Sequence, residues 1–169
     1  NALTPLNKNS EYEFGPEFTP KNNHLLYWYK TDKNPAGVTD LYIRDDNGIS
    51  LNLSSSLDRN ITSYKWLSSN NEILAYGDDG TTDGVWIISL EGKIRKASFS
   101  NSFVISSLTI NKKGEIVLIG SKGSQPKELF YLKDHSSTPI QISHYNDTFK
   151  NMKLGKVETI EWETDLNIT

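Results

Sequence analysis

The feature that most constrains the fold is a recurring unit of short apolar segments joined by polar turns. Its clearest copy lies within residues 63–77, where two apolar segments flank the turn Ser68–Asn71. Branched and aromatic residues between clusters of Asn, Asp, Ser and Gly are typical of β-strands and hairpins. No segment keeps a helical period of apolar residues over three turns. The sequence therefore predicts an all-β protein.

The same order of four strands occurs three times along the chain. The predicted strands are Phe14–Phe18, Leu25–Tyr29, Asp40–Arg44 and Ile49–Leu53; then Ile61–Leu67, Glu72–Gly77, Gly84–Leu90 and Ile94–Ser98; then Val104–Ile110, Glu115–Gly120, Glu128–Lys133 and Pro139–Ser143. Aligning the first turns pairs Phe18 with Trp66, at an offset of 48 residues, and Trp66 with Thr109, at an offset of 43 residues. A fourth copy is expected to start at Val157–Trp162, after the loop His144–Lys156.

Four strands that repeat every 40–50 residues or so are typical of β-propeller blades. One blade is apolar on both faces, so neighbouring blades must cover it. We therefore expect a β-propeller fragment of about three four-stranded antiparallel blades, with Trp66 buried between blades. Gly77, Gly84 and Gly120 are predicted to end strands where the chain turns. A β-sandwich is the alternative, because its strands have similar spacing.

This pattern divides the chain into blades and connections. Residues 15–56, 57–100 and 101–144 are the predicted blades, and 145–169 a connection toward a following domain. Residues 1–14 are predicted to be the end of a preceding blade and a connection, with Leu3–Pro5 ending the last strand of that blade. Three blades cannot plausibly close a ring, since closed propellers have about four to eight. Both terminal blades should then present an apolar face. The chain is expected either to form a homo-oligomer through these faces or to survive only as an open arc with poor solubility.

Composition excludes some classes of function. A net charge of −3 over 169 residues argues against a nucleic-acid partner, which usually meets a basic surface. No apolar run approaches the roughly 18–20 residues of a membrane span. The absence of Cys excludes disulfides, thiolate metal sites and a Cys nucleophile, and leaves the compartment undetermined. Because the chain starts at Asn1 without Met or a signal peptide, we expect a mature or excised piece.

No catalytic constellation is predicted. A hydrolase nucleophile elbow reads Gly-x-Ser-x-Gly, which exposes the Ser on a sharp turn. The nearest match, Gly48–Asn52 around Ser50, lacks the second Gly and crosses a hairpin turn, so we interpret it as structural. Phosphate-binding and dinucleotide-binding glycine motifs are absent. We predict no catalytic residue, no cofactor and no cofactor-binding residue.

No metal ligands are predicted either. His24, His135 and His144 are far apart in the sequence, and nothing indicates convergent ligands. The acidic segment Asp78–Gly84 could hold Ca²⁺, but it lacks the alternating ligand spacing of the known twelve-residue loop. We interpret it as an acidic connection without a metal.

Two further sets of residues have ordinary interpretations. Strand alternation between two buried blade faces assigns most aromatic residues to the core; they are Tyr27, Trp28, Tyr29, Tyr64, Trp66, Trp86, Phe130 and Tyr131. Glycosylation sequons begin at Asn52, Asn60, Asn146 and Asn167, a number near chance in a chain rich in Asn, Ser and Thr.

Three stretches resemble a known repeat. Phe18–Tyr27 is similar to the motif F-S-P-D-G-K-x-L-A-Y, with Lys-Asn-Asn in place of Asp-Gly-Lys. Pro139–Asn146 is similar to P-x-Q-L-T-x-F-N, and Lys156–Asp165 to P-E-x-I-x-W-x-S-x-D-G without its final Gly. These motifs belong to the propellers of prolyl oligopeptidase-family serine peptidases, which include acylaminoacyl-peptidases and dipeptidyl peptidases. The first motif also resembles TolB-like propellers.

The resemblance implies a function that uses no catalytic residue of this chain. The chain would be a non-catalytic propeller segment that filters peptide access to an α/β-hydrolase domain outside this sequence. Its implied partners are that hydrolase domain of the same protein and peptides. The alternative is a TolB-like propeller that docks partner proteins. A polysaccharide-degrading propeller enzyme would need clustered His and acidic ligands, which the sequence lacks.

Overall fold

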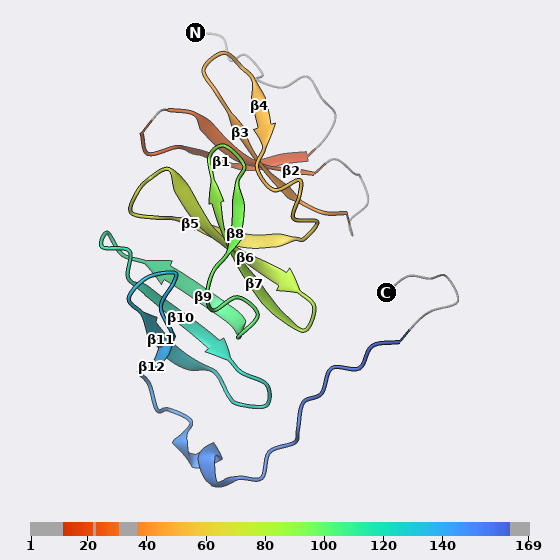
Figure 1. The fold of residues 1–169 in the computed structure, drawn as a ribbon, viewed down its shortest axis with the longest axis vertical. Helices are drawn as coiled ribbons and strands as arrows, with labels where there is room; N and C mark the ends of the chain where they lie inside the picture. Colours follow the sequence, from red (N-terminus) through yellow and green to blue (C-terminus); the bar gives the residue numbers. More distant parts are fainter. Residues whose placement is uncertain (1–11, 22, 31–36, 163–169) are drawn as a thin grey trace. The chain divides into compact units, whose positions relative to one another are not determined.

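The computed structural model describes residues 12–21, 23–30 and 37–162. Within these ranges the chain forms twelve strands and one short 3₁₀-helix. The strands make three four-stranded sheets, each hydrogen-bonded in chain order (Figure 1). The predicted fold class, an all-β propeller fragment of about three blades, is confirmed. The predicted strand Leu3–Pro5 and most of the loop Thr31–Thr39 lie outside the described residues.

The strand boundaries lie close to the predicted ones. The first sheet contains β1 (Tyr12–Phe18), β2 (Leu25–Lys30), β3 (Asp40–Arg44) and β4 (Ser50–Asn52). The second contains β5 (Ile61–Trp66), β6 (Glu72–Asp79), β7 (Thr82–Ser89) and β8 (Ile94–Lys96). The third contains β9 (Val104–Ile110), β10 (Ile116–Ser121), β11 (Glu128–Leu132) and β12 (Ile140–Gln141).

The chain divides into two compact units. The first comprises Asn1–Asp78 and Val85–Lys96, and therefore the first sheet with most of the second. The second comprises Asp79–Gly84 and Ala97–Thr169, and therefore the third sheet with the end of the β6–β7 hairpin. The predicted blade boundaries at 15–56, 57–100 and 101–144 stay a prediction.

The core of the first unit lies between its two sheets. Its buried members are Leu26, Leu41, Ile43 and Leu53 of the first sheet and Ile61, Ile73, Ala75, Trp86 and Ile88 of the second. Trp86 is only 2% exposed, whereas Trp66 is partly buried at the margin of this cluster. The expectation that Trp66 is buried between blades is therefore wrong in degree, because Trp66 is only partly buried and its Nε1–H donates to the exposed Glu17 at 3.1 Å.

Glycine ends the hairpin turns where a positive φ is needed. In the β3–β4 turn, the Asp45 carbonyl accepts from the Gly48 amide, and Gly48 has φ of 82°. Asp45 Oδ1 also accepts from the amides of Asn47 and Ile49. Gly92 and Gly114 occupy the same place in later turns, with φ of 81° and 85°. Glycine adopts this left-handed conformation at little energetic cost, because it has no Cβ.

Gly77, Gly84 and Gly120 do not end strands as predicted, because they lie inside β6, β7 and β10. The pairing of β5 with β6 skips one residue just before Gly77 meets Ile61, and that of β9 with β10 skips one at Gly120. A Cβ on Gly77 would lie 2.0 Å from the Asn60 carbonyl oxygen. Gly77 is therefore required by the close approach of backbone at a β-bulge.

The register corrects the predicted alignment of the repeats by one residue. Trp66 pairs with Ile73, the second residue of β6, and Ile110 pairs with Ile116, the first residue of β10. Ile110, rather than Thr109, is therefore the counterpart of Trp66. The difference arises in the turn, since Leu67 and Glu72 close one hairpin while Asn111 and Glu115 close a shorter one.

The segment Val157–Trp162 forms no strand, so the structure does not contain the predicted start of a fourth blade. The 3₁₀-helix Asp147–Asn151 lies within the predicted loop before it. After this helix the chain continues without secondary structure (Figure 1). Val157, Ile160 and Trp162 are 63%, 75% and 72% exposed.

Candidate functional surfaces

A buried carboxylate organises one end of the third sheet. Glu128, the first residue of β11, is 8% exposed. Its carboxylate accepts hydrogen bonds from the Ser143 hydroxyl and from the Asn146 amide, the latter at 2.8 Å. These bonds, that of Ser143 foremost, hold the pKa of Glu128 below its usual value. The carboxylate thereby fixes the chain that leaves β12.

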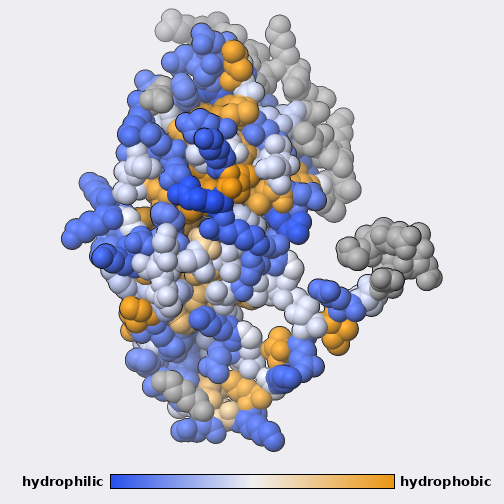
Figure 2. Space-filling view, viewed as in Figure 1, coloured by the Kyte–Doolittle hydropathy of each residue, from blue (hydrophilic) through white to orange (hydrophobic). Residues whose placement is uncertain are grey.

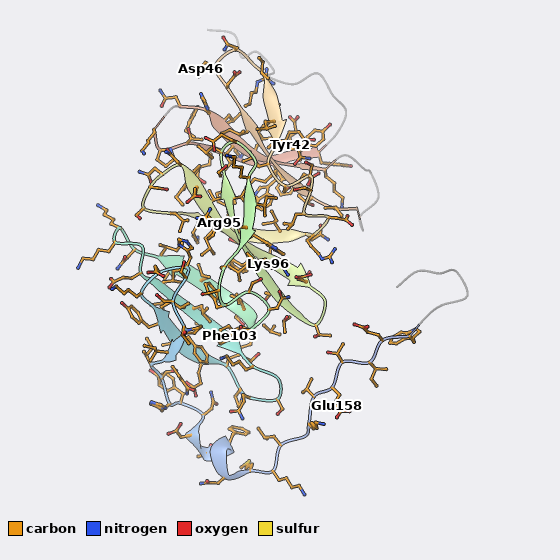
Figure 3. All side chains as sticks on the ribbon, in the orientation of Figure 1. Tyr42, Asp46, Arg95, Lys96, Phe103 and Glu158 are labelled. Atoms are coloured by element: carbon orange, nitrogen blue, oxygen red, sulfur yellow. The ribbon has the colours of Figure 1, made fainter. Side chains whose placement is uncertain are left out.

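A small pocket of about 170 Å³ opens beside this carboxylate. It is lined by Lys122, Gln125, Pro126, Glu128, Phe130, Gln141, Asn146 and Asp147. The Lys122 ammonium lies 4.5 Å from the ring centre of Phe103 and 5.7 Å from that of Phe130 (Phe103 is labelled in Figure 3). Ligand pockets usually measure about 300–1,000 Å³, so this one is too small for a peptide.

The first sheet contains a counterpart of the Glu128–Ser143 pair. Ser54 Oγ donates to Asp40 at 2.7 Å and accepts from the Leu41 amide at 2.9 Å. In the third sheet, Ser143 Oγ accepts from the Leu129 amide at 2.8 Å. Because the same bonds recur at the same place in two sheets, the Glu128 carboxylate is a structural element of the repeat rather than a group reserved for catalysis. Sequence reasoning missed both pairs, since a lone Ser after a strand carries no distinctive signal.

Glu17 joins the two sheets of the first unit. Its carboxylate accepts from the Tyr64 hydroxyl at 2.8 Å and from Trp66 Nε1. Burial, with the bond to Glu17 as the second cause, raises the pKa of Tyr64 well above its usual value. The hydroxyl therefore remains a donor throughout the neutral pH range.

The third sheet presents an apolar face. Ile119, Ile140 and Ile142 are 40%, 61% and 51% exposed. Register places them beside half-buried side chains on the same face, since Ile119 pairs with Leu129 and Ile140 with Tyr131. The side of the molecule drawn in Figure 2 is mostly hydrophilic, with several groups of apolar residues. The hydrogen bonds of the third sheet do not account for this apolar face.

Ser50 lies in a strand and not on a nucleophile elbow. It is the first residue of β4 and pairs with Arg44 across the β3–β4 hairpin. Its hydroxyl accepts from the Tyr27 hydroxyl at 3.1 Å, so its described partner is a phenol and not an imidazole. The interpretation of Gly48–Asn52 as structural stays a prediction.

The three histidines have separate surroundings. His24 and His135 accept hydrogen bonds through their carbonyl oxygens, from Thr19 and Ser98 respectively. His144 Nδ1 lies 3.4 Å from a carboxylate oxygen of Asp147. In the described part of the chain, no three His, Cys, Asp or Glu side chains are grouped as metal ligands would be.

The acidic segment Asp78–Gly84 is mostly strand, because β6 extends to Asp79 and β7 begins at Thr82. Asp79 accepts from the Asn101 side chain at 3.0 Å. Asp83 is 8% exposed and accepts from the Ile105 amide. Both carboxylates thus serve the junction with the segment before β9.

The core interpretation of the eight aromatic residues holds in full for three of them and in part for the other five. Tyr27, Trp86 and Phe130 are buried, and Trp28, Tyr29, Tyr64, Trp66 and Tyr131 are partly buried. Three sequon amides form hydrogen bonds: Asn52 donates to Asp40 at 2.9 Å, Asn146 donates to the Lys127 carbonyl at 2.9 Å, and Asn60 Oδ1 accepts from the Thr39 amide at 3.0 Å. Among the residues that the structure describes, no helix is long and apolar enough to cross a membrane.

Three sheets of four strands in chain order, with glycine bulges at matching places in the second and third, define a β-propeller segment. No protein-family profile and no curated protein sequence matches the chain. Among solved structures, the AtxE2 isopeptidase with Astexin3-dC4 bound is similar, with a TM-score of 0.71 and 17% identity over 86% of this chain. An acylaminoacyl peptidase from Pyrococcus horikoshii is similar with a TM-score of 0.59 and 17% identity over 77% of this chain.

These likenesses concern the fold. The chain spans 23% of the length of the isopeptidase and 20% of that of the acylaminoacyl peptidase. Acylaminoacyl-peptidases are among the enzymes whose propeller motifs the sequence resembles. The fold implied by that resemblance, a segment like those found in these peptidases, is therefore confirmed.

Proposed function

We propose that this chain is a non-catalytic β-propeller segment of a serine peptidase of the prolyl oligopeptidase or acylaminoacyl-peptidase type. The observation that carries the proposal is the likeness of the fold over 86% of this chain to a stretch of a peptidase about four times as long. The motifs at Pro139–Asn146 and Lys156–Asp165 support it independently, because they resemble the end of such a propeller.

The proposed role is a steric filter. The segment contributes part of a wall through which short peptides reach a hydrolase domain outside this sequence, while folded proteins are excluded. A wall of this kind needs rigid sheets and no reactive groups. The buried Trp86 core and the satisfied carboxylates of Asp40 and Glu128 provide that rigidity.

The first test is an activity assay on the chain alone, with chromogenic aminoacyl, acylaminoacyl and prolyl substrates. Hydrolysis should stay at background, and Ser50→Ala should change nothing. Turnover that survives purification and disappears in Ser50→Ala would contradict the non-catalytic role. Ser54→Ala is the matched control, since Ser54 hydrogen-bonds Asp40 and lies outside the elbow-like stretch.

The second test concerns the hydrolase partner. The gene should encode a Gly-x-Ser-x-Gly motif within a few hundred residues after Thr169. In the complete protein, deletion of this segment should raise hydrolysis of a folded protein substrate relative to a short peptide. An unchanged ratio would refute the filter while leaving the peptidase assignment standing.

A TolB-like interaction propeller is the second candidate. The exposed Ile119, Ile140 and Ile142 favour it, because an exposed apolar surface commonly marks a protein interaction site. A parent sequence without a hydrolase motif would decide for this candidate.

A further inference from the structure

We propose that the pocket beside Glu128 binds a small free amino acid as its zwitterion. The ligand ammonium meets the Glu128 carboxylate, and the ligand carboxylate meets the Lys122 ammonium. The walls of the pocket come from the β10–β11 loop, from β11 and β12, and from the chain that follows β12. The proposal rests on this cavity and on the charges that line it, and it is independent of the proposed function.

The pocket lies away from the exposed apolar face of the third sheet. Glu128 and Phe130 alternate along β11 with Leu129 and Tyr131, so their side chains point to the opposite face. On that face Phe130 is buried and pairs with Gln141 of β12. The walls of the pocket therefore come from this sheet and its own connections.

Glu128 brings a buried negative charge that can accept a further hydrogen bond. An ionised carboxylate has about four acceptor positions. Three of those on Glu128 take the Ser143 hydroxyl and the amides of Tyr145 and Asn146, the two amides at 3.4 and 2.8 Å. These three partners are neutral, whereas a buried carboxylate is stabilised most by a cation. A ligand ammonium at the fourth position supplies that cation.

A second carboxylate, that of Asp147, also lines the pocket. Its side chain is 49% exposed and lies 3.4 Å from His144 Nδ1. Water and salt screen a charge at such an exposed position. We therefore assign the ligand ammonium to Glu128, which is 8% exposed.

Lys122 brings the positive charge, and aromatic rings hold it in place. Its ammonium lies 4.5 Å from the ring centre of Phe103 and 5.7 Å from that of Phe130. The two rings pack against each other with centres 4.6 Å apart, and Phe103 is buried (Figure 3). An ammonium has three N–H donors. Those that point away from the rings can donate to a ligand carboxylate.

The spacing of the two charges suits an α-amino acid. Glu128 and Phe130 are two residues apart on one face of β11, which is about 6–7 Å along a strand. The Lys122 ammonium lies over the Phe130 ring, and Lys122 and Glu128 line the same pocket. Because an α-amino acid carries its ammonium and its carboxylate on one carbon, a single small molecule can meet both groups.

The volume of the pocket limits the side chain of the ligand. A cavity of about 150 Å³ holds one benzene molecule. At about 170 Å³ the pocket therefore fits an amino acid of similar size, such as glycine, alanine or serine. Leucine and phenylalanine are too large for it.

The test is titration of the chain as given with L-alanine at neutral pH, followed in two-dimensional NMR spectra. We expect saturable shifts of the Gly123 and Asn146 amide signals, with a dissociation constant below about 5 mM. Acetate and methylamine each carry only one of the two charges, so each should bind at least about 10-fold more weakly than alanine. L-Leucine should bind more weakly for steric reasons.

Two variants assign the charges. Lys122→Gln and Glu128→Gln should each weaken alanine binding at least about 10-fold, because each removes one charged partner. Lys112→Gln is the matched control, since Lys112 is exposed in the β9–β10 turn and does not line the pocket. Glu128 also holds the chain after β12, so the exposed Lys122 is the deciding position. Circular dichroism checks that each variant is folded.

Four results would overturn the proposal. Acetate or methylamine bound as tightly as alanine would show a site for a simple anion or cation. Leucine bound as tightly as alanine would place the ligand outside this pocket. Unchanged affinity in folded Lys122→Gln would remove the assigned carboxylate partner. The absence of saturable shifts up to about 50 mM alanine would exclude the site altogether. All four results leave the proposed peptidase role untouched.

Discussion

Replacement of Trp86 by Ala should destabilise the first unit more than any other tryptophan replacement. Trp86 is 2% exposed, in the cluster between the first two sheets. A tryptophan buries about 150–250 Å². At about 25 cal/mol per Å² that area is worth about 4–6 kcal/mol. Partial relaxation around the cavity brings the expected loss of unfolding free energy to about 3–5 kcal/mol.

Two further tryptophans provide an internal scale. Trp162→Ala should change stability by less than about 0.5 kcal/mol, as exposed positions do, because Trp162 is 72% exposed. The loss of unfolding free energy for Trp66→Ala should lie between those for Trp86→Ala and Trp162→Ala, since Trp66 is partly buried and donates to Glu17. The predicted order of destabilisation is Trp86, Trp66, Trp162.

The assay is urea and thermal unfolding followed by far-ultraviolet circular dichroism, which does not depend on the removed indole. A loss of about 3–5 kcal/mol corresponds to a fall in melting temperature of about 6–20 °C for a chain of this size. A loss for Trp86→Ala below about 1 kcal/mol, or no larger than that for Trp162→Ala, would refute the packing of the two sheets described here.

Three further substitutions test the backbone and the titrating groups. Gly77→Ala should cost about 1–3 kcal/mol or more through overpacking, measured by urea unfolding, whereas Gly155→Ala should be neutral because nothing lies within 4 Å of its added Cβ. The raised pKa of Tyr64 means that the folded state holds its proton more tightly than the unfolded state. Stability should therefore decline as pH rises above about 10, and Tyr64→Phe should make that decline shallower. An identical slope would contradict the partial burial of the Tyr64 hydroxyl and its hydrogen bond to Glu17. The pKa of Glu128 is lowered in the folded state, so its effect on stability runs in the opposite direction with pH. Glu128 stabilises the fold above its unfolded pKa, and this stabilisation is lost as pH falls through the folded pKa. Glu128→Gln should flatten the acid limb of a stability–pH curve, while Glu91→Gln serves as the exposed control.

The strands could be predicted from sequence because their signals are local. Asp40–Arg44 and Val104–Ile110 were bounded to the residue, since turn-forming residues flank branched and aromatic segments on both sides. The repetition of these segments also gave the number of sheets. Nothing beyond alternation and turn chemistry was needed.

The register of the repeats required the structure. A turn shorter by one residue between β9 and β10 moved the counterpart of Trp66 from Thr109 to Ile110. Turn residues mark where a hairpin lies but do not fix its length to one residue. The role of Gly77 was missed for a related reason, because its constraint comes from the Asn60 carbonyl, which belongs to the segment before the neighbouring strand.

The candidate surfaces were the least predictable. The carboxylates of Asp40 and Glu128 looked like ordinary strand-flanking charges, and only the fold brings Ser54 and Ser143 to them. The apolar strands of the third blade were expected to be covered on one side only, but which side chains stand on the uncovered side depends on the pairing of β10 with β11. The segment Val157–Trp162 has strand-like composition without a paired strand.

Side chains make hydrogen bonds between the first and second blades: Glu17 accepts from Tyr64 and Trp66, Lys21 donates to the Ser69 carbonyl, and Asn60 accepts from the Thr39 amide. The backbone hydrogen-bond ladder of each sheet joins only the four strands of that sheet. If one whole sheet were duplicated or lost, the hydrogen-bond ladders of the remaining sheets would stay intact. Only the newly adjacent apolar faces would have to pack against each other. The unit that evolution can add or remove in such a chain is therefore one blade of about forty residues. Substitutions on the faces of a blade decide which blades can pack against it.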